Sequence, residues 1–375
     1  MLTCVAAPQN RQTDREIIVV IPVYNAVSSL NTAVNSVRSQ PYSQAKIILV
    51  DDGSTDGSSA LCDQFAASDT NVHVIHQENS GVSSARNIAI EYCLQHYTDG
   101  YVAFLDADDF WNANALSLEV QHYIQTEHDI DIFAFGGFRS NADMTCFSVP
   151  YTYSDEIRSG GNSAIWSLKG QFVANFYSLN LLRKWNIRFF PTLKYSEDVI
   201  FRLQCSFLSR RIHYLAQILY CYRENHTSAM SKVLQIPPID YFIPIINGWI
   251  QSDEFLNSFA KETHAKCRAG EILSGIYFMD MAEYHFRRGY GKTALYGIFH
   301  SHPHFCNLTN LSRKDISPKQ YSNKQLLLKH PFLFQCKYRI LGYFENIARR
   351  FATTKVGVYL RNKWRYPLSS MPVNN

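Results

Sequence analysis

Short apolar runs alternate with helical stripes over the first hundred residues of the chain. The runs are rich in β-branched and aromatic residues, which is typical of strands buried on both faces, and they cover residues 17–21, 47–50, 72–75 and 101–105. After the first run, apolar residues from Leu30 to Val37 repeat at the spacing of one helix face. Strands that alternate with helices through short links predict a parallel sheet with right-handed crossovers.

The pattern changes in the second half of the chain. Further strand-like runs cover residues 129–135 and 212–222, and the polar segment 140–165 between them predicts a loop over the sheet. From about residue 235 the apolar residues repeat with a helical period. We therefore expect four segments, which are a flexible leader over 1–15, an α/β domain over 16–232, a helical region over 233–328 and a basic aromatic tail over 329–375.

The composition is that of a globular protein with reduced thiols. Of 375 residues, 46% are hydrophobic and 18% charged, and the formal net charge is +4. The nine cysteines are scattered without Cys-x-x-Cys spacing, so neither a zinc site nor a redox motif is indicated, and a cytosolic compartment is expected. The chain shows no signal peptide and no apolar run of the roughly eighteen residues that a membrane-spanning helix needs. We expect the protein to stay on the cytoplasmic side of any membrane it contacts.

Three acids follow the apolar run that ends at Leu105. Asp106 and Asp108 are two positions apart, so an extended backbone points both the same way, and Asp109 follows directly. Acids at the end of an apolar strand need a neutralising partner, and a divalent cation that carries phosphate oxygens can supply it. Mg²⁺ and Mn²⁺ prefer one or two carboxylates together with such phosphates. The alternative is a strand-to-helix turn in which Asp108 or Asp109 caps the next helix.

Five motifs in order resemble family 2 glycosyltransferases of the GT-A fold. They are Pro22-Val-Tyr-Asn25, Asp51-Asp-Gly-Ser-Thr-Asp56, Gly81-Val-Ser-Ser-Ala-Arg-Asn87, Phe104-Leu-Asp-Ala-Asp-Asp109 and Ser196-Glu-Asp198. The resemblance covers roughly residues 16–230 and makes this segment the catalytic domain. It implies an α/β nucleotide-diphospho-sugar transferase fold, with a Rossmann-like, mostly parallel sheet and a helical C-terminal extension.

The resemblance implies a site for a UDP-sugar donor at the strand ends. The ring of Tyr24 can lie against uracil, Asp52 can accept a hydrogen bond from uracil N3–H, and Arg86 would contact the nucleotide side or an acid there. The simpler alternatives are an aromatic ring packed on its own helix, an Asp-Gly turn in which Asp51 is the structural partner, and a surface arginine. The donor-binding residues implied in this way are Pro22, Tyr24, Asn25, Asp51, Asp52, Gly81, Arg86, Asp106, Ala107 and Arg223.

The metal site and the catalytic acids also follow from the resemblance. Asp108 would bind a Mn²⁺ or Mg²⁺ ion that bridges the two phosphates, and Asp106 would contact the ribose or reach the metal through water. Asp198 would be the general base and Glu197 would orient the acceptor, although acids in the first turn of a helix are also favoured by its dipole. A single base opposite the leaving group implies in-line displacement with inversion at the anomeric carbon.

The end of the chain is basic and aromatic. Eight Lys or Arg lie between His330 and Tyr366 against one acid, Glu345, and aromatic residues are interleaved with them. An amphipathic helix of this kind suits an anionic membrane surface, where lipid-linked acceptors reside. The alternative is a helix packed on the catalytic domain. No nucleic-acid-binding module is recognisable, so no nucleic-acid partner is expected.

Together these features predict an inverting, metal-dependent glycosyltransferase. It would move a hexose or N-acetylhexosamine from a UDP-sugar to a hydroxyl of a growing surface glycan, such as lipopolysaccharide, lipooligosaccharide or capsule, at the cytoplasmic face of the inner membrane. One alternative is a sugar nucleotidyltransferase, which would need a Gly-rich, basic loop where this chain has Pro22 to Asn25. Another is a non-catalytic sugar- or membrane-binding scaffold, which would not need both Asp108 and Asp198.

Overall fold

The computed structural model describes the chain from Arg15 to Lys337 with gaps. The described residues are 15–42, 44–113, 115–141, 151–161, 172–193, 195–223, 237–287, 302–311 and 318–329, with Leu295, Phe299 and Lys337. Most of the predicted leader and of the predicted tail lies outside them. Arg15, the last residue of the predicted leader, is buried and donates to the carbonyl oxygens of Ile124 (3.0 Å) and Glu127 (2.8 Å). The folded domain therefore includes Arg15.

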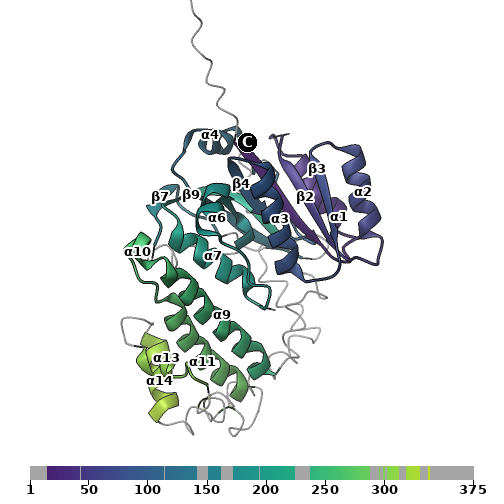
Figure 1. Cartoon of the computed structure of the whole chain (residues 1–375). Coiled ribbons are helices and arrows are strands. Elements are labelled where there is room, and N and C mark those ends of the chain that lie inside the picture. The colour runs from purple at the N-terminus through teal and green to yellow at the C-terminus, as the bar shows by residue number, and fades with distance from the viewer. Residues whose placement is uncertain are drawn as a thin grey trace, which may run out of the picture.

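Nine strands form one sheet within these residues (Figure 1). The order is β3-β2-β1-β4-β8-β6-β9-β5, and β7 also pairs with β9. The strands are β1 (Glu16–Val23), β2 (Lys46–Asp52), β3 (Val72–Gln77), β4 (Gly100–Phe104), β5 (Phe110–Trp111), β6 (Ile132–Ser140), β7 (Glu156–Ser159), β8 (Asn175–Ser178) and β9 (Arg211–Arg223). The first four pair in parallel, as the alternating pattern predicts.

Three strands depart from the predicted parallel arrangement. β5, β7 and β8 each run antiparallel to their partners, and β8 lies between β4 and β6. These strands have only two to four residues, so they carry too little hydrophobic pattern to be recognised in the sequence. The sheet is therefore mostly parallel, with short antiparallel insertions.

The strand directions bring the predicted motifs to one edge of the sheet. The carboxyl ends of β1, β2 and β4 share an edge because these strands are parallel. β8 is antiparallel to β4 and β6 is antiparallel to β8, so β6 points the same way as β4. β9 is parallel to β6 and therefore also ends at this edge. Open sheets of this kind bind ligands beyond the carboxyl ends of their strands.

The helices form two groups. Those of the sheet domain are α1 (Leu30–Arg38), α2 (Ser58–Ser68), α3 (Val82–His96), α4 (Leu118–Thr126), α6 (Leu179–Trp185) and α7 (Glu197–Leu208), with a short 3₁₀ turn at Phe172–Ala174. Those of the helical region are α9 (Pro238–Ser258), α10 (Ala260–Thr263), α11 (Ala269–Arg287), α13 (Cys306–Asn310) and α14 (Pro318–Lys329). No helix in the described part of the chain is long and apolar enough to cross a membrane.

The helical region is packed against the sheet domain through α9, which lies along α7 in Figure 1. Trp249 of α9 is buried in the core of the sheet domain, whereas Phe242 and Ile246 belong to a second core shared with α11. Gly248 is the contact point, since a β-carbon there would lie 2.7–2.8 Å from side-chain atoms of Leu193 and Ile200. α9 therefore joins the two cores.

Candidate active site

Arg86 links the two groups of acids in the site. Its guanidinium group donates to Asp106 (2.7 Å) and to Glu197 (3.1 Å), and it lies over the ring of Phe189, 5.3 Å from the centroid. The Arg86 side chain is only 4% exposed. Burial acts to lower the pKa of Arg86, but the charges of Asp106, Glu197 and Asp198 outweigh it and raise the pKa. The buried guanidinium group of Arg86 thus connects the end of β4 to the start of α7.

Asp109 anchors the end of β9 to the turn after β4. Its carboxylate accepts hydrogen bonds from the Tyr220 hydroxyl (2.5 Å) and from the backbone N–H of Arg223 (2.8 Å). Burial and the charges of Asp106 and Asp108 raise its pKa to about 8. The next helix, α4, is capped by Ser117 and not by either acid, because the Ser117 side chain accepts from the N–H of Val120. The helix-capping alternative for these acids is therefore wrong.

Asp108 carries a carboxylate that has no partner on another described residue. Within the described part of the chain, its donor is the backbone N–H of Asp108 itself, and its backbone carbonyl accepts a hydrogen bond from Nε of Arg223 (2.8 Å). Burial and the neighbouring Asp106 raise its pKa, and Arg223 partly opposes them. A buried acid in this state is stabilised by a cation.

The donor set fits a cation that is held jointly by protein and phosphate. Within the described residues, no three His, Cys, Asp or Glu side chains gather into a metal-binding group. Mg²⁺ and Mn²⁺ do not need such a group when phosphates supply oxygen ligands, because one or two carboxylates then suffice. Asp106 and Asp108 match that requirement.

Glu197 and Asp198 begin α7 and differ in their contacts. Burial and the adjacent Asp198 raise the pKa of Glu197 to about 7, against the effect of Arg86. Burial also raises the pKa of Asp198, and Arg86 opposes that rise. Glu197 is fixed by its bond to Arg86, whereas the carboxylate of Asp198 accepts from the backbone N–H of Val199 and, among the described residues, from no side chain. Ser196 precedes them at the N-cap position, in a left-handed conformation (φ 60°) and without a side-chain capping bond.

Asp52 holds the loop that leads into α3. Its carboxylate accepts hydrogen bonds from Gln77 Nε2 (2.5 Å) and from the backbone N–H groups of Ser80 (2.8 Å) and Gly81 (2.9 Å). Gly81 has a φ of 88°, a conformation that favours glycine. These bonds place the start of α3, and hence Arg86, relative to the end of β2. Binding of uracil by Asp52 stays a prediction.

Asp51 organises the turn after β2. It accepts hydrogen bonds from the Ser54 N–H (3.0 Å), from the Ser59 hydroxyl and from Nδ1 of His76 (3.0 Å). Burial would raise the pKa of Asp51, but these bonds outweigh it and lower the pKa. The bonds to Asp51 and then to Asp63 raise the pKa of His76. In these contacts Asp51 is the structural partner within the Asp-Gly turn.

The loop after β1 leaves an aromatic ring exposed. Tyr24 is 54% exposed, and Asn25 has a φ of 49°. The Asn25 N–H donates to Ser54 Oγ (3.1 Å), and its side-chain oxygen accepts from the N–H of Thr55 (2.8 Å). These bonds fix the Tyr24 loop to the turn after β2. Two further residues were predicted to bind the donor. Pro22 is aligned with Val50 in the sheet, and Ala107 is buried.

The predicted residues therefore gather at one edge of the sheet, and sequence reasoning missed several that support them. Tyr220, Phe189 and Gln77 contact Asp109, Arg86 and Asp52 respectively. Tyr220 is 111 positions from Asp109, and no local pattern signals such a contact. Residues 224–236, which follow Arg223, lie outside the described residues.

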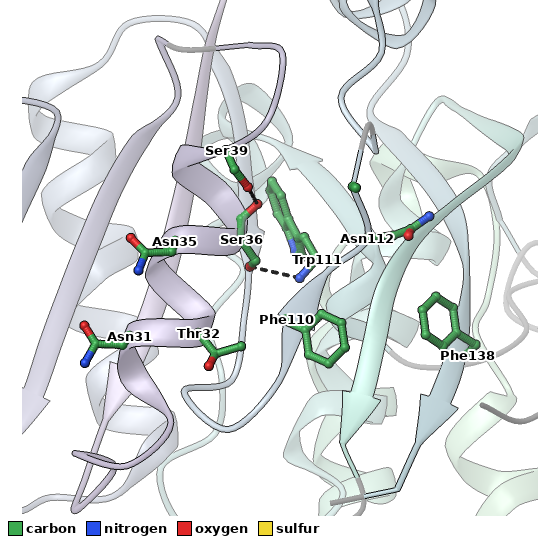
Figure 2. A pocket seen from close by; sticks show the side chains of 10 residues that line it. Asn31, Thr32, Asn35, Ser36, Ser39, Phe110, Trp111, Asn112 and Phe138 are labelled. Carbon is green, nitrogen blue, oxygen red and sulfur yellow. Dashed lines mark hydrogen bonds between the residues drawn. The ribbon is translucent and has the colours of Figure 1, made fainter. Parts of the chain in front are cut away.

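A pocket of about 620 Å³ opens elsewhere, between α1 and β5 (Figure 2). In this view Thr32 and Ser36 of α1 face Phe110 and Trp111. The backbone N–H of Trp111 donates to Ser36 Oγ (3.0 Å). The lining residues are Asn31, Thr32, Asn35, Ser36, Ser39, Phe110, Trp111, Asn112, Ala113 and Phe138. None of them belongs to the set predicted to bind donor, metal or acceptor.

Comparison with known proteins agrees with this geometry. Glycosyltransferase GlyA of Streptococcus pneumoniae is 28% identical over 56% of this chain and 31% of its own length. The minor teichoic acid biosynthesis protein GgaA of Bacillus subtilis is 27% identical over 55% of this chain and 47% of its own length. The chain thus spans less than two thirds of the length of either relative.

The structural comparison shows the fold. The crystal structure of S. aureus TarS 1–349 in complex with UDP-GlcNAc superimposes with a TM-score of 0.51. The sequence identity is 21%, and the match covers 73% of this chain and 82% of that one. The mostly parallel sheet, with its helices and its helical C-terminal region, is thus the GT-A fold that the motifs imply. The sequence model of glycosyl transferase family 2 matches residues 18–179. Residues 18–179 are therefore similar to glycosyl transferase family 2 domains.

Proposed function

We propose that the protein is an inverting, metal-dependent glycosyltransferase with a UDP-sugar donor. The observation that carries the proposal is the link through Arg86 between the acids after β4 and the acid pair of α7. It brings Asp108, the proposed metal ligand, and Asp198, the proposed base, to the same end of the sheet. A neighbour solved with UDP-GlcNAc supports a hexose or N-acetylhexosamine as the group transferred.

Donor binding uses the strand ends. The exposed ring of Tyr24 stacks on uracil, and Asp52 and Arg223 lie on the nucleotide and diphosphate sides. Asp108 and Asp106 hold Mn²⁺ or Mg²⁺, which would neutralise the charge that develops on the departing UDP. The carboxylate of Asp108, which has no partner on another described residue, and its raised pKa support this assignment.

Asp198 removes the proton of the acceptor hydroxyl. Its raised pKa makes it a stronger proton acceptor than an exposed aspartate, and among the described residues its carboxylate accepts from the backbone N–H of Val199 but from no side chain. The acceptor oxygen forms a bond to the anomeric carbon as the bond to the β-phosphate oxygen breaks. The proton goes to Asp198, the electron pair leaves with UDP, and the anomeric centre inverts. Glu197, held by Arg86, orients the acceptor.

The acceptor is a growing surface glycan or a lipid-linked glycan. A relative named for teichoic acid biosynthesis supports a cell-surface polymer. The basic aromatic tail would hold the enzyme on the anionic, cytoplasmic face of the inner membrane as a peripheral protein. Most of this tail lies outside the described residues, so its sequence alone supports the assignment.

A screen of UDP-sugars for Mn²⁺-dependent UDP release, with and without EDTA, tests the proposal. We expect one donor to be consumed, and Asp108→Asn to lose both the activity and the Mn²⁺-dependent binding of UDP. A nucleotidyltransferase would instead form a UDP-sugar and pyrophosphate from UTP and a sugar 1-phosphate. A scaffold would bind UDP without turnover. Metal-independent release at the wild-type rate by Asp108→Asn would contradict the metal assignment.

A further inference from the structure

A row of partly exposed side chains runs along the helical region. Tyr277, Asp280 and Tyr284 are three and four positions apart on α11, so they share one flank of that helix. Tyr241 of α9 lies close to this flank: burial, and then the neighbouring Tyr277 and Tyr284, raise the pKa of Tyr241. Tyr195, which precedes α7, contacts Tyr241 with ring centroids 5.1 Å apart. We call these five residues the tyrosine row.

One end of the tyrosine row lies beside the proposed base. Burial raises the pKa of Tyr277, and the polar side chains of Ser196 and Trp249 beside its hydroxyl oppose that rise. Ser196 directly precedes Glu197 and Asp198. The negative charge of Asp198 acts on the hydroxyls of both Tyr241 and Tyr277. α9 and α11 thus present aromatic groups next to the carboxylate that would receive the acceptor proton.

Packing between α9 and α11 explains why the tyrosines of the row are partly buried, but it does not explain the position of Asp280. Tyr277 contacts the rings of Phe242 and Trp249, and Tyr284 contacts Phe242, so these tyrosines help to join α11 to α9. Asp280 is different, because no described residue donates a hydrogen bond to it or forms an ion pair with it. Burial, and then the charge of Glu283, raise its pKa to about 6. A half-buried acid without a partner is costly unless a ligand supplies donors.

We propose that the tyrosine row binds the acceptor saccharide, with Asp280 accepting hydrogen bonds from its hydroxyl groups. This inference rests on the proposed function, since it extends the site from the transferred sugar to the receiving one. Tyrosine rings offer flat apolar faces to the C–H face of a sugar ring, and each also carries a polar hydroxyl. A carboxylate forms short, strong hydrogen bonds with hydroxyl donors. One end of the tyrosine row lies near Asp198, so a saccharide bound along the row would place one terminal hydroxyl at the proposed base.

The rigid attachment of α9 supports this role. Gly248 lets α9 approach Leu193 and Ile200 closely, and the N–H groups of Gly270 and Glu271 on α11 donate to Asp253 of α9 (both 2.8 Å). These contacts fix both helices relative to α7. The helical region therefore supplies part of the acceptor site, and its sequence would determine which acceptor is used.

The test compares acceptor and donor affinity in the full-length protein. p-Nitrophenyl glycosides of glucose, galactose, N-acetylglucosamine and N-acetylgalactosamine serve as acceptor probes, with the donor found by the UDP-sugar screen. Asp280→Asn is expected to raise the KM for the best glycoside by about tenfold to a hundredfold, as for loss of a hydrogen bond to a charged group. Tyr277→Ala is also expected to raise this KM, because the sugar loses the face of the ring. Glu271→Gln is the matched control, because Glu271 lies on α11 and pairs with Arg268 instead.

Binding of UDP with Mn²⁺, measured by calorimetry, separates failure of this inference from failure of the proposed function. Unchanged UDP affinity together with a raised glycoside KM supports the tyrosine row as the acceptor site. Unchanged glycoside KM in both variants overturns it, as does a wild-type protein that turns over its donor but neither transfers to nor binds any glycoside. A wild-type protein that binds no UDP overturns the proposed function, and this inference with it.

Discussion

At the scale of single residues, the site depends on the neutralisation of buried acids. Arg86 is 4% exposed at its side chain and pairs with Asp106 and Glu197, which are 35% and 14% exposed. Removing one partner of a buried ion pair leaves the other charge uncompensated, which is costlier than losing an exposed pair. Arg86 is therefore needed for the stability of the site as well as for its arrangement.

Arg86→Ala is expected to lower the free energy of unfolding by about 3 kcal/mol, because Asp106 and Glu197 lose their shared cation. Arg188→Ala is the control, since Arg188 pairs with Glu91, which is 54% exposed, and its loss should cost less than about 1 kcal/mol. Urea unfolding of both variants measures the difference. Equal losses in the two variants would show that Arg86 contributes no more than a surface ion pair.

Asp198→Asn is expected to reduce sugar transfer by about a hundredfold or more, since the acceptor proton loses its receiver. The affinity for UDP in the presence of Mn²⁺ should stay that of the wild type. Steady-state transfer rates and UDP titration measure the two effects. A loss of less than about tenfold would exclude Asp198 as the base, and Glu197→Gln would then be the variant to compare.

The sequence allowed candidate site residues to be selected, but it did not allow the contacts between them to be predicted. The acids after β4 could be selected because they follow an apolar strand, and ligands bind beyond the strand ends of such sheets. The pair at the start of α7 was selected only through the resemblance to family 2 glycosyltransferases. The pairing of Arg86 with both acid groups could not be derived, because Arg86 and Glu197 are 111 positions apart and the register between α3 and α7 is set by packing. The hydrogen bond from Tyr220 to Asp109 escaped notice for the same reason.

At the scale of elements, long and regular segments were predictable and short ones were not. The helical stripe from Leu30 to Val37 corresponds to α1, and all four of its apolar residues are buried. The strand-like run at residues 129–135 predicted a strand. The observed strand, β6, begins at Ile132 and continues to Ser140. β8 has four residues between two longer strands, so only the sheet around it defines it as a strand.

The contact between α9 and α11 depends on a glycine. A β-carbon at Gly270 would lie 2.0 Å from the backbone carbonyl oxygen of Trp249, so Gly270→Ala must push the helices apart. We expect a loss of about 1–3 kcal/mol, as for overpacking, and a lower midpoint in thermal unfolding. Gly248→Ala meets only the ends of the Leu193 and Ile200 side chains, which can rotate, and should cost less. A larger loss for Gly248→Ala would contradict this ranking.

At the scale of the whole molecule, catalysis and membrane attachment should be separable. The proposed catalytic residues all lie before residue 224, whereas the basic tail begins near residue 330. Each Lys or Arg near an anionic surface contributes roughly 1 kcal/mol, so several together give reversible binding that salt weakens.

Truncation before His330 is therefore expected to abolish binding to phosphatidylglycerol-containing vesicles while UDP-sugar hydrolysis continues. Co-sedimentation with vesicles at low and high salt, together with a hydrolysis assay, measures both. Lys337 donates to Asn323 of α14 (2.8 Å), so a truncated protein that unfolds would indicate that this segment is packed on the helical region instead. Equal vesicle binding by both forms would contradict attachment through the tail.

The wide separation of paired residues also has a consequence for protein synthesis. Arg86 and Asp109 leave the ribosome long before their partners Glu197 and Tyr220, because the two residues of each pair are 111 positions apart. At translation rates of roughly 5–20 residues per second, this interval lasts about 5–20 s. During it, β1 to β4 can form while the acids at the end of β4 still lack the residues of α7 and β9. The site is therefore expected to assemble last in the sheet domain, and the proposed donor could stabilise it only after Arg223 has been synthesised.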